Sequence, residues 1–243
     1  MKGKLALVTG GSQGIGAAIV HELSTYGCRV IFNYLRNHEK ATELVDSIRQ
    51  SGGFCEAYQV DFSNVGEIST FFKTVAAAHT SLDILVNNAG IMINTPIADV
   101  SEEEFDQIFD LNVKGLFFSC REAIRIMNTG GSIINIGTTV TKMMLPGYGT
   151  YAASKGAVEQ ITRVLAKELG PRGIRVNCVS PGPTDTSLFR RGKTEQQVQN
   201  LASMSAFNRI GTPEEIAQMV RLLCTKESGW VSGQNIFTNG GLI

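Results

Sequence analysis

The sequence lacks the features that mark membrane proteins, nucleic-acid-binding proteins and metalloproteins. No apolar run approaches the roughly 20 residues that span a bilayer, so no membrane segment is expected. Lys plus Arg and Asp plus Glu are balanced at 22 each, which leaves no electrostatic footprint for a nucleic acid or an anionic membrane. The three histidines form no pair at ligand spacing, so we expect no metal.

The cysteines and the N-terminus favour a reducing compartment. The five cysteines are scattered and lack Cys-x-x-Cys spacing, as expected for reduced and mostly buried thiols. The chain passes from Met1 through Lys4 directly into an apolar segment, without the shape of a signal peptide. We therefore expect a cytoplasmic protein.

Apolar segments of strand length alternate with longer segments of helical period along the 243 residues. The expected strands are Leu5–Thr9, Arg29–Asn33, Cys55–Val60, Ile84–Val86, Ser132–Ile136, Arg175–Val179 and Gln234–Phe237. The expected helices are Gly14–Tyr26, Glu39–Ser51, Val65–His79, Ser101–Met127, Thr150–Leu169 and Pro213–Cys224. This alternation predicts the α/β class: a doubly wound, seven-stranded parallel sheet of the Rossmann type, covered by helices on both faces. No linker or repeat interrupts the pattern, so residues 1–243 are expected to form a single domain.

Two connections are unusually long for this pattern. They span residues 137–149, after the fifth expected strand, and residues 180–212, after the sixth. Both leave the carboxyl ends of strands, where doubly wound sheets bind their ligands. Long loops at such places form substrate pockets or lids more often than idle surface. We therefore expect both segments to contact the substrate.

A glycine-rich segment follows the first expected strand and opens the first expected helix. Its spacing, Gly-x-x-x-Gly-x-Gly, allows a tight turn and a close approach of the backbone to phosphate. The unpaired N–H groups and the positive dipole end of the helix would then face the anion. The segment is therefore predicted to bind the pyrophosphate of a dinucleotide. The residues expected to do so are Gly10, Ser12, Gln13, Gly14, Ile15 and Gly16.

The end of the second expected strand distinguishes NADP from NAD. An NAD site normally places Asp or Glu there to accept from the ribose 2′-hydroxyl, whereas a 2′-phosphate requires a cation. Here the first acid is Glu39, which already enters a helix, and Arg36 can form charge-assisted hydrogen bonds with the phosphate. NADP, used as NADPH, is therefore the expected cofactor, with NAD less favoured. An ordinary solvated residue at a helix entry is the alternative interpretation of Arg36.

Tyr151 and Lys155 stand four residues apart and hence on one face of a helix. Hydride transfer to a carbonyl builds negative charge on oxygen and needs a proton donor, for which Tyr151 is the candidate. A free phenol has a pKa of about 10, which is poorly matched to neutral pH. The ammonium of Lys155 favours the phenolate, so we expect it to lower the pKa of Tyr151. Lys155 can also bond the ribose hydroxyls on the nicotinamide side.

Together with a string of two asparagines, alanine and glycine between them, these motifs make the sequence resemble the short-chain dehydrogenase/reductase family, from Lys4 to Gly241. The resemblance implies that Asp61 bonds the adenine edge and that Thr186 holds the nicotinamide carboxamide. It implies that Asn87 braces neighbouring strands while the next two residues border the adenosine ribose. The further cofactor contacts that it implies are Asn87, Asn88, Ala89, Gly90, Pro181, Gly182 and Thr184.

By the same resemblance, a serine after the fifth strand should bond the substrate oxygen, but this chain has threonines there. The usual spacing back from Tyr151 falls on Thr138, and Thr139 is the competing candidate. A threonine donates the same hydrogen bond but is stiff at χ1 and adds a methyl group. Asn112 matches the helix-kinking asparagine of the family, which holds a water that links Lys155 to solvent. The expected catalytic residues are Asn112, Thr138, Tyr151 and Lys155.

The expected substrate pocket is apolar and rich in methionine, which suits a fairly bulky ketone or secondary alcohol. Its expected contacts are Thr138, Met144, Tyr148, Tyr151 and Leu188. The preferred function is an NADPH-dependent carbonyl reductase. One alternative is a 3-oxoacyl-[acyl-carrier-protein] reductase, and another is a dinucleotide-binding sensor or scaffold without catalysis. In the first alternative, an acidic carrier would meet the basic residues Arg190, Arg191 and Lys193. An ordinary solvated surface run is the other interpretation of these residues.

An enoyl reductase is disfavoured by the spacing of the catalytic pair. Enoyl reductases of this family typically place the lysine seven residues after the tyrosine, where this chain has Val158. The resemblance also implies a homotetramer, with a homodimer as the alternative. Its interfaces would be formed by the expected helices 101–127 and 150–169 and by the last strand. Apolar residues such as Phe117 and Ile161 fit that interface, but they are equally compatible with packing on the sheet.

Overall fold

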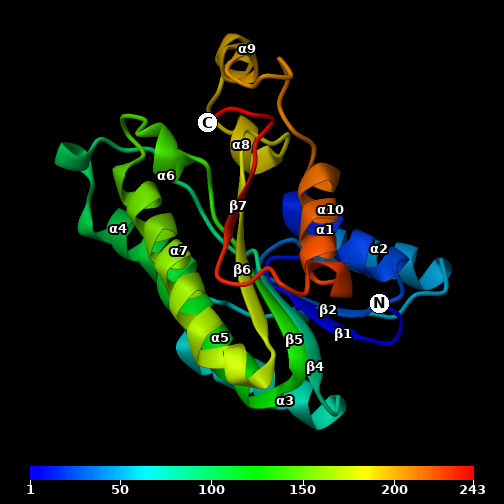
Figure 1. The fold of residues 1–243 in the computed structure, drawn as a ribbon. Coiled ribbons are helices and arrows are strands. Elements are labelled where there is room, and N and C mark those ends of the chain that lie inside the picture. The colour runs from blue at the N-terminus through cyan, green and yellow to red at the C-terminus, as the bar shows by residue number, and fades with distance from the viewer.

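The computed structural model describes residues 1–243 and contains one sheet of seven strands, each parallel to its neighbours (Figure 1). The strands are β1 (Leu5–Val8), β2 (Arg29–Tyr34), β3 (Cys55–Gln59), β4 (Leu82–Asn87), β5 (Met127–Ile136), β6 (Arg175–Pro181) and β7 (Asn235–Thr238). Their order in the sheet is β3-β2-β1-β4-β5-β6-β7. This confirms the predicted doubly wound fold. The order reverses between β1 and β4, and such a reversal opens a ligand crevice at the carboxyl ends of the strands.

Helices cover both faces of the sheet and enclose two apolar cores (Figure 1). On one face pack α1 (Gly14–Thr25), α2 (His38–Gln50) and α10 (Pro213–Leu223). On the other face pack α3 (Val65–Ala78), α5 (Leu116–Ile126) and α7 (Gly149–Leu169). The central strands are buried on both sides, as in β1, whose four residues are all buried. Burial on both sides explains why the strand segments of the sequence are apolar at nearly every position.

The helices begin with different capping chemistry, and one difference matters for the site. At α10, Thr212 and Glu215 form a capping box: the Thr212 hydroxyl accepts from the Glu215 amide, and the Glu215 carboxylate accepts from the Thr212 amide at 2.8 Å. At α1, no side chain caps the helix, whose N-cap residue is Gln13. The first N–H groups of α1 therefore remain available to an external acceptor.

The predicted helix over 101–127 is three elements in the structure. They are α4 (Glu102–Phe109), the wider π-helical turn η2 (Asp110–Gly115) and α5. The chain packs tightly where η2 ends, because a Cβ on Gly115 would lie 2.1 Å from the Phe62 carbonyl oxygen. A single π-helical turn hardly alters the spacing of apolar residues along a helix, so this spacing alone predicts an uninterrupted helix. The end of that prediction was also wrong, because Met127 already belongs to β5.

The two long connections contain short helices that the sequence did not predict. Residues 137–149 include α6 (Val140–Met143), and residues 180–212 include α8 (Ser187–Arg190) and α9 (Glu195–Ser203). These helices follow the carboxyl ends of β5 and β6 (Figure 1). None of the helices in the structure combines the length and the apolar character that a bilayer crossing requires.

Candidate active site

The glycine-rich segment forms a cradle between β1 and α1. Gly10 and Gly14 have φ angles of +65° and +53°, a region that side chains rarely adopt. A Cβ on Gly16 would lie 2.2 Å from the carbonyl oxygen of Gly10, so the turn closes only with glycine there. The uncapped start of α1 opens into the same turn. Backbone N–H groups, a helix dipole and the absence of side chains together fit the pyrophosphate of a dinucleotide.

Two asparagines hold this cradle in place. The Gly10 amide donates to Oδ1 of Asn33 at 2.9 Å, and Nδ2 of Asn33 donates to the Val60 carbonyl at 2.9 Å. From the other side, Nδ2 of Asn88 donates to the carbonyls of Thr9 (2.9 Å) and Gly10 (3.1 Å). The side chain of Asn88 is thus committed to the glycine turn. Asn33 was missed in the sequence, although a polar residue at the end of a buried apolar strand was a usable signal.

The other residues expected around the adenosine half follow β3 and β4. Asp61 accepts from the amide and hydroxyl of Ser63 at 2.8 and 2.7 Å through Oδ1, and its Oδ2 makes no protein hydrogen bond. Asn87 donates to Oδ1 of Asn135 at 2.9 Å and so joins β4 to β5. The amide of Ala89 donates to the Thr9 hydroxyl at 2.9 Å. These contacts place all of them at the carboxyl edge of the sheet.

Arg36 lies at the tip of β2, exposed and without an ion pair or a side-chain hydrogen bond in the structure. Beside it, Nδ2 of Asn37 donates to Oε1 of Gln13 at 2.7 Å, which joins the β2 tip to the glycine cradle. Tyr34 and His38 are also paired, with 2.6 Å between the phenol oxygen and Nδ1. The sequence analysis missed this pairing. The guanidinium of Arg36 is therefore available to a ligand at the edge of the cradle.

The segment after β6 folds back over the cradle. The Thr184 hydroxyl donates to the Gly182 carbonyl at 2.9 Å. Thr186 caps α8 by accepting from the Phe189 amide at 3.1 Å. Its methyl carbon lies 3.3 Å from the position that a Cβ on Gly14 would take. The structure therefore brings the segment of Pro181 to Thr186 next to the glycine turn, although the two are far apart in the sequence.

Tyr151 and Lys155 lie on the face of α7 that meets the end of β5. The Lys155 ammonium donates to the Ile136 carbonyl at 2.8 Å. Of the two candidate threonines, Thr138 has its hydroxyl beside the phenol of Tyr151, with which it interacts. The Thr139 hydroxyl instead donates to the Ser180 carbonyl at 3.3 Å, and this residue is 1% exposed. The bond of Thr139 to Ser180 therefore favours Thr138 as the partner of Tyr151.

Burial dominates the protonation of this pair. It raises the pKa of Tyr151 to about 12, and the nearby Thr138 hydroxyl opposes that rise. It lowers the pKa of Lys155 to about 8. We expected Lys155 to lower the pKa of Tyr151, but in the structure its ammonium donates to the Ile136 carbonyl, and burial of the phenol raises that pKa instead. The phenol is therefore protonated at neutral pH.

Asn112 lies inside the π-helical turn and is completely buried. Its Oδ1 accepts from the Ile91 amide at 2.9 Å, and its Nδ2 donates to the Ile91 carbonyl at 2.9 Å and to the Ser154 hydroxyl at 3.1 Å. Gly90 lies between this side chain and the ammonium: a Cβ there would be 3.1 Å from Oδ1 of Asn112 and 3.4 Å from Nζ of Lys155. Asn112 thus ties η2 to the loop after β4, directly behind Lys155.

The residues expected to contact substrate surround the mouth of this site. Met144 is 87% exposed with a left-handed backbone (φ +53°), whereas Tyr148 and Leu188 are half-buried. The Thr95 amide donates to the Gly147 carbonyl at 2.9 Å and so joins the loop after β4 to the loop after β5. Ile97 lies in the loop after β4 and is 80% exposed. The sequence analysis did not place it among the substrate contacts.

The basic cluster predicted near α8 is largely occupied within the chain. Arg190 donates to both carboxylate oxygens of Asp185, at 2.5 and 3.1 Å, and to Glu195 at 3.0 Å. Lys193 donates to the Phe189 carbonyl at 2.8 Å. Two of the three cations are thus committed to partners of the same chain, which disfavours an acidic carrier on this surface.

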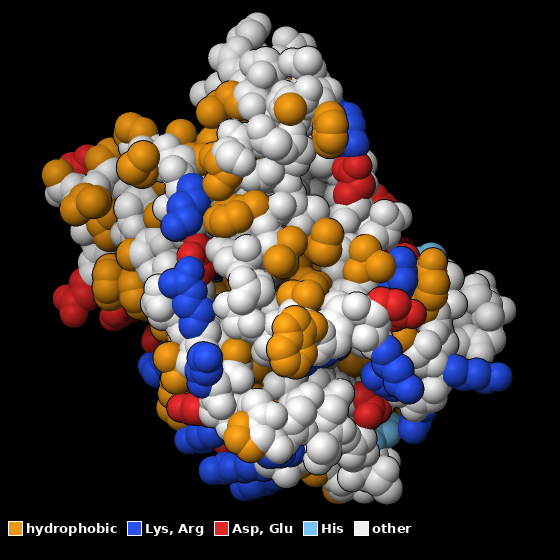
Figure 2. All heavy atoms as spheres, viewed as in Figure 1, with side chains coloured by type: hydrophobic (Ala, Val, Ile, Leu, Met, Phe, Trp, Pro, Cys, Tyr) orange, Lys and Arg blue, Asp and Glu red, His pale blue; other side chains and the backbone are white.

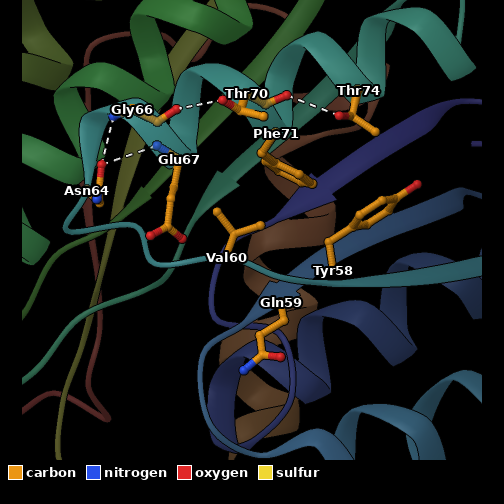
Figure 3. A pocket seen from close by; sticks show the side chains of 9 residues that line it. All are labelled: Tyr58, Gln59, Val60, Asn64, Gly66, Glu67, Thr70, Phe71 and Thr74. Atoms are coloured by element: carbon orange, nitrogen blue, oxygen red, sulfur yellow. Dashed lines mark hydrogen bonds between the residues drawn. The ribbon is translucent and has the colours of Figure 1, made fainter.

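A separate groove of about 450 Å³ lies between β3 and α3, away from these residues (Figure 3). Its threonine hydroxyls donate to carbonyls of their own helix, as from Thr70 to Gly66 at 3.0 Å. The residues that line it are Tyr58, Gln59, Val60, Asn64, Gly66, Glu67, Thr70, Phe71 and Thr74. The residues predicted to be catalytic are not among them, so we assign the groove no part in the redox site.

Comparison with known proteins decides the family. A family model described as enoyl-(acyl carrier protein) reductase matches residues 10–243. A short chain dehydrogenase/reductase of Aspergillus novofumigatus, nsrJ, is 38% identical over 253 residues, which cover 99% of this chain and 96% of the relative. The chain belongs to the short-chain dehydrogenase/reductase family. This confirms the family prediction, and the family consists of oxidoreductases that act on CH–OH and C=O groups.

Solved structures of short-chain dehydrogenases/reductases share the whole fold. One from Burkholderia cenocepacia, in complex with NADP, is 35% identical with a TM-score of 0.94 and covers 99% of this chain and 98% of its own. The angucycline C-6 ketoreductase LanV, with bound NADP, is 36% identical with a TM-score of 0.93, and the coverages are 99% and 96%. Both share the α/β architecture from end to end.

Proposed function

We propose that this short-chain dehydrogenase/reductase uses NADPH to reduce a fairly bulky, apolar ketone to a secondary alcohol. The observation that carries the proposal is the placement of the Thr138 hydroxyl beside a protonated Tyr151 at the carboxyl end of β5, with Lys155 one helical turn away. The glycine cradle fits the dinucleotide on the same edge of the sheet. Two similar proteins bind NADP, and one of them is a ketoreductase.

In this proposal the chain's residues handle the proton and the developing charge. NADPH held in the glycine cradle of Gly10, Gly14 and Gly16 would supply the hydride that the carbonyl carbon accepts. Tyr151 donates its phenolic proton to the carbonyl oxygen, and Thr138 donates a hydrogen bond to the same oxygen as negative charge grows on it. Lys155, held by the Ile136 carbonyl, stabilises the phenolate that remains. The product is the neutral alcohol, and Tyr151 regains its proton from solvent.

A substrate panel tests the proposed reaction. NADPH oxidation is followed spectrophotometrically with cyclohexanone, acetophenone, 2-tetralone and a 3-oxoacyl thioester, and the reverse reaction with the corresponding alcohols. We expect the bicyclic ketone to be reduced with the highest kcat/KM, because the pocket mouth is apolar. Preference for the thioester would favour the carrier-protein alternative, and cofactor binding without turnover of any compound would favour the sensor.

The expected cofactor preference rests on Arg36. Replacing Arg36 with alanine should weaken NADPH binding by about 10- to 100-fold, the free energy of one or two hydrogen bonds to a charged group. NADH, which lacks the 2′-phosphate, should bind nearly unchanged. The measurement is the dissociation constant of each cofactor by fluorescence titration, with Lys40→Ala on the exposed face of α2 as the control. Equal losses for both cofactors would contradict the assignment.

We propose that the chain forms a homotetramer. The α5–α7 side leaves Phe117 51% exposed and Val164 55% exposed, and these apolar side chains favour burial against another subunit. Near β7, Trp230 is fully exposed, and Figure 2 shows hydrophobic side chains gathered on the face that carries β7 and α10. Sedimentation velocity at micromolar concentration should show a tetramer that Val164→Asp dissociates. If both the wild type and Val164→Asp sediment as monomers, the proposed tetramer is disproved.

A cytoplasmic location completes the proposal. All five cysteines are free and buried, and no pair forms a disulfide. Unpaired thiols are typical of proteins that work in a reducing compartment.

A further inference from the structure

α7 contacts the end of β5 and the turn that follows it at three points, and the α7 residues involved repeat along one helical stripe. Tyr151 meets the hydroxyl of Thr138, and Lys155 donates to the Ile136 carbonyl at 2.8 Å. The third point is Glu159, whose Oε1 accepts from the Thr141 hydroxyl at 2.7 Å. Residues spaced by four lie above one another on a helix. The stripe that carries the proposed acid and the ammonium therefore continues to a carboxylate.

The Thr141 hydroxyl connects this carboxylate to the proposed oxyanion donor. Besides Glu159, it lies 3.1 Å from the carbonyl of Thr138, in the turn that begins α6. In the same turn, the Val140 amide donates to the Thr138 hydroxyl at 3.3 Å. The turn thus fixes Thr138 by its carbonyl and by its side chain. The contact between Glu159 and Thr141 joins the whole turn to α7.

Glu159 is an unusual group to place there for packing alone. It is 6% exposed and makes no ion pair. A buried carboxylate without a cation costs free energy, whereas an apolar side chain in the same place would not.

We propose that Glu159 is a positioning residue, which acts through Thr141 to hold the Thr138 hydroxyl in line with Tyr151. The inference rests on the proposed function, because it gives Thr138 the role of donor to the substrate oxygen. Neither Glu159 nor Thr141 needs to touch the substrate. Loss of the contact would let the α6 turn shift and the Thr138 hydroxyl leave its place, and small displacements of catalytic groups reduce turnover steeply.

The test is a mutant cycle that uses the best ketone of the substrate panel, with 2-tetralone tried first. Thr141→Val removes the hydroxyl at nearly constant volume, Thr141→Ser retains it, Glu159→Leu removes the acceptor, and Glu159→Gln retains one. We expect Thr141→Val and Glu159→Leu each to lower kcat by about 10- to 100-fold. The serine and glutamine variants should stay within about threefold of the wild type, because the hydrogen bond is retained. The dissociation constant of NADPH should be unchanged in all four.

The decisive comparison places Thr141→Val in a Thr138→Ala background. If Thr141 acts through Thr138, the second substitution should have no further effect on kcat, since the group that it positions is gone. Thr225→Val is the matched control: Thr225 is also half-buried and donates to a backbone carbonyl (Leu222, 2.8 Å), at the other end of the sheet. It should leave kcat unchanged in both backgrounds.

The outcomes separate this inference from the proposed function. An impaired Thr138→Ala with an unimpaired Thr141→Val would overturn the positioning role alone, as would equal losses from Thr141→Val in both backgrounds. A Thr138→Ala enzyme as active as the wild type would overturn the role of Thr138 and this inference with it. If Glu159→Leu does not fold, the pair Thr141→Val and Thr141→Ser still decides, because the carboxylate then stays in place.

Discussion

Replacing Tyr151 with phenylalanine is expected to reduce kcat by about 10⁴-fold, the upper range for loss of a general acid. The substitution removes only the phenol oxygen and retains the ring. The ammonium of Lys155 is not positioned to supply the proton instead, because it donates to the Ile136 carbonyl. The measurement is single-turnover reduction of the best ketone of the panel, which separates the chemical step from product release.

The control for this variant is Tyr58→Phe in β3, which is an edge strand. The Tyr58 hydroxyl donates to Glu56 at 3.0 Å, and β2, β1 and β4 separate its strand from β5. It should leave kcat unchanged, and both variants should bind NADPH like the wild type. A Tyr151→Phe enzyme with more than about a tenth of the wild-type rate would show that another group delivers the proton.

Thr138→Ala is expected to lower kcat by about 10²–10³-fold, as for the removal of one donor to a developing oxyanion. Thr138→Ser should retain most of the activity, because the hydroxyl remains and only a methyl group is lost. That loss also widens the pocket, so the serine enzyme should accept bulkier ketones. Steady-state kinetics on the three enzymes gives the comparison.

Thr139→Ala is the rival variant. Its hydroxyl donates to the Ser180 carbonyl, so its loss should reduce stability more than catalysis. If Thr139→Ala is crippled while Thr138→Ala works normally, the donor has been assigned one residue too early. If neither substitution matters, no threonine here polarises the carbonyl.

The sequence predicted the layout of the fold because the central strands are buried on both faces. Seven apolar runs with helical segments between them leave little choice of architecture, and all seven strands were found within a few residues of their predicted places. The predicted strand boundaries were wrong where strand pairing extends beyond the apolar run of residues. β5, for example, begins at Met127, and its next three residues are exposed and polar or glycine. Hydrophobicity does not mark such an extension.

The candidate site shows a similar division between what the sequence could and could not predict. Local geometry was predictable: the spacing of Tyr151 and Lys155 puts them on one face of α7 in the structure. Contacts between distant segments were not. The sequence marks Asn33 as a polar residue at the end of an apolar strand, but it does not show that Asn33 holds Gly10 or that Glu159 reaches Thr141, because each contact depends on which strand or turn lies opposite. The prediction that the pKa of Tyr151 is lowered was wrong for the same reason, because burial, which raises it, is a property of the whole fold.

The buried ammonium of Lys155 also sets a limit on how stable this protein can be. Its pKa is about 8 in the folded chain against an ordinary value of 10.5, so folding disfavours the protonated form. Below pH 8 both the folded and the unfolded chains carry the proton, and the fold then bears a penalty of about 3 kcal/mol. As pH rises from 8 towards 10.5, the folded chain releases the proton first and the penalty disappears. At neutral pH the charge on Lys155, beside the proposed proton donor, therefore lowers the free energy of unfolding by an amount that is a substantial part of the stability of a typical domain.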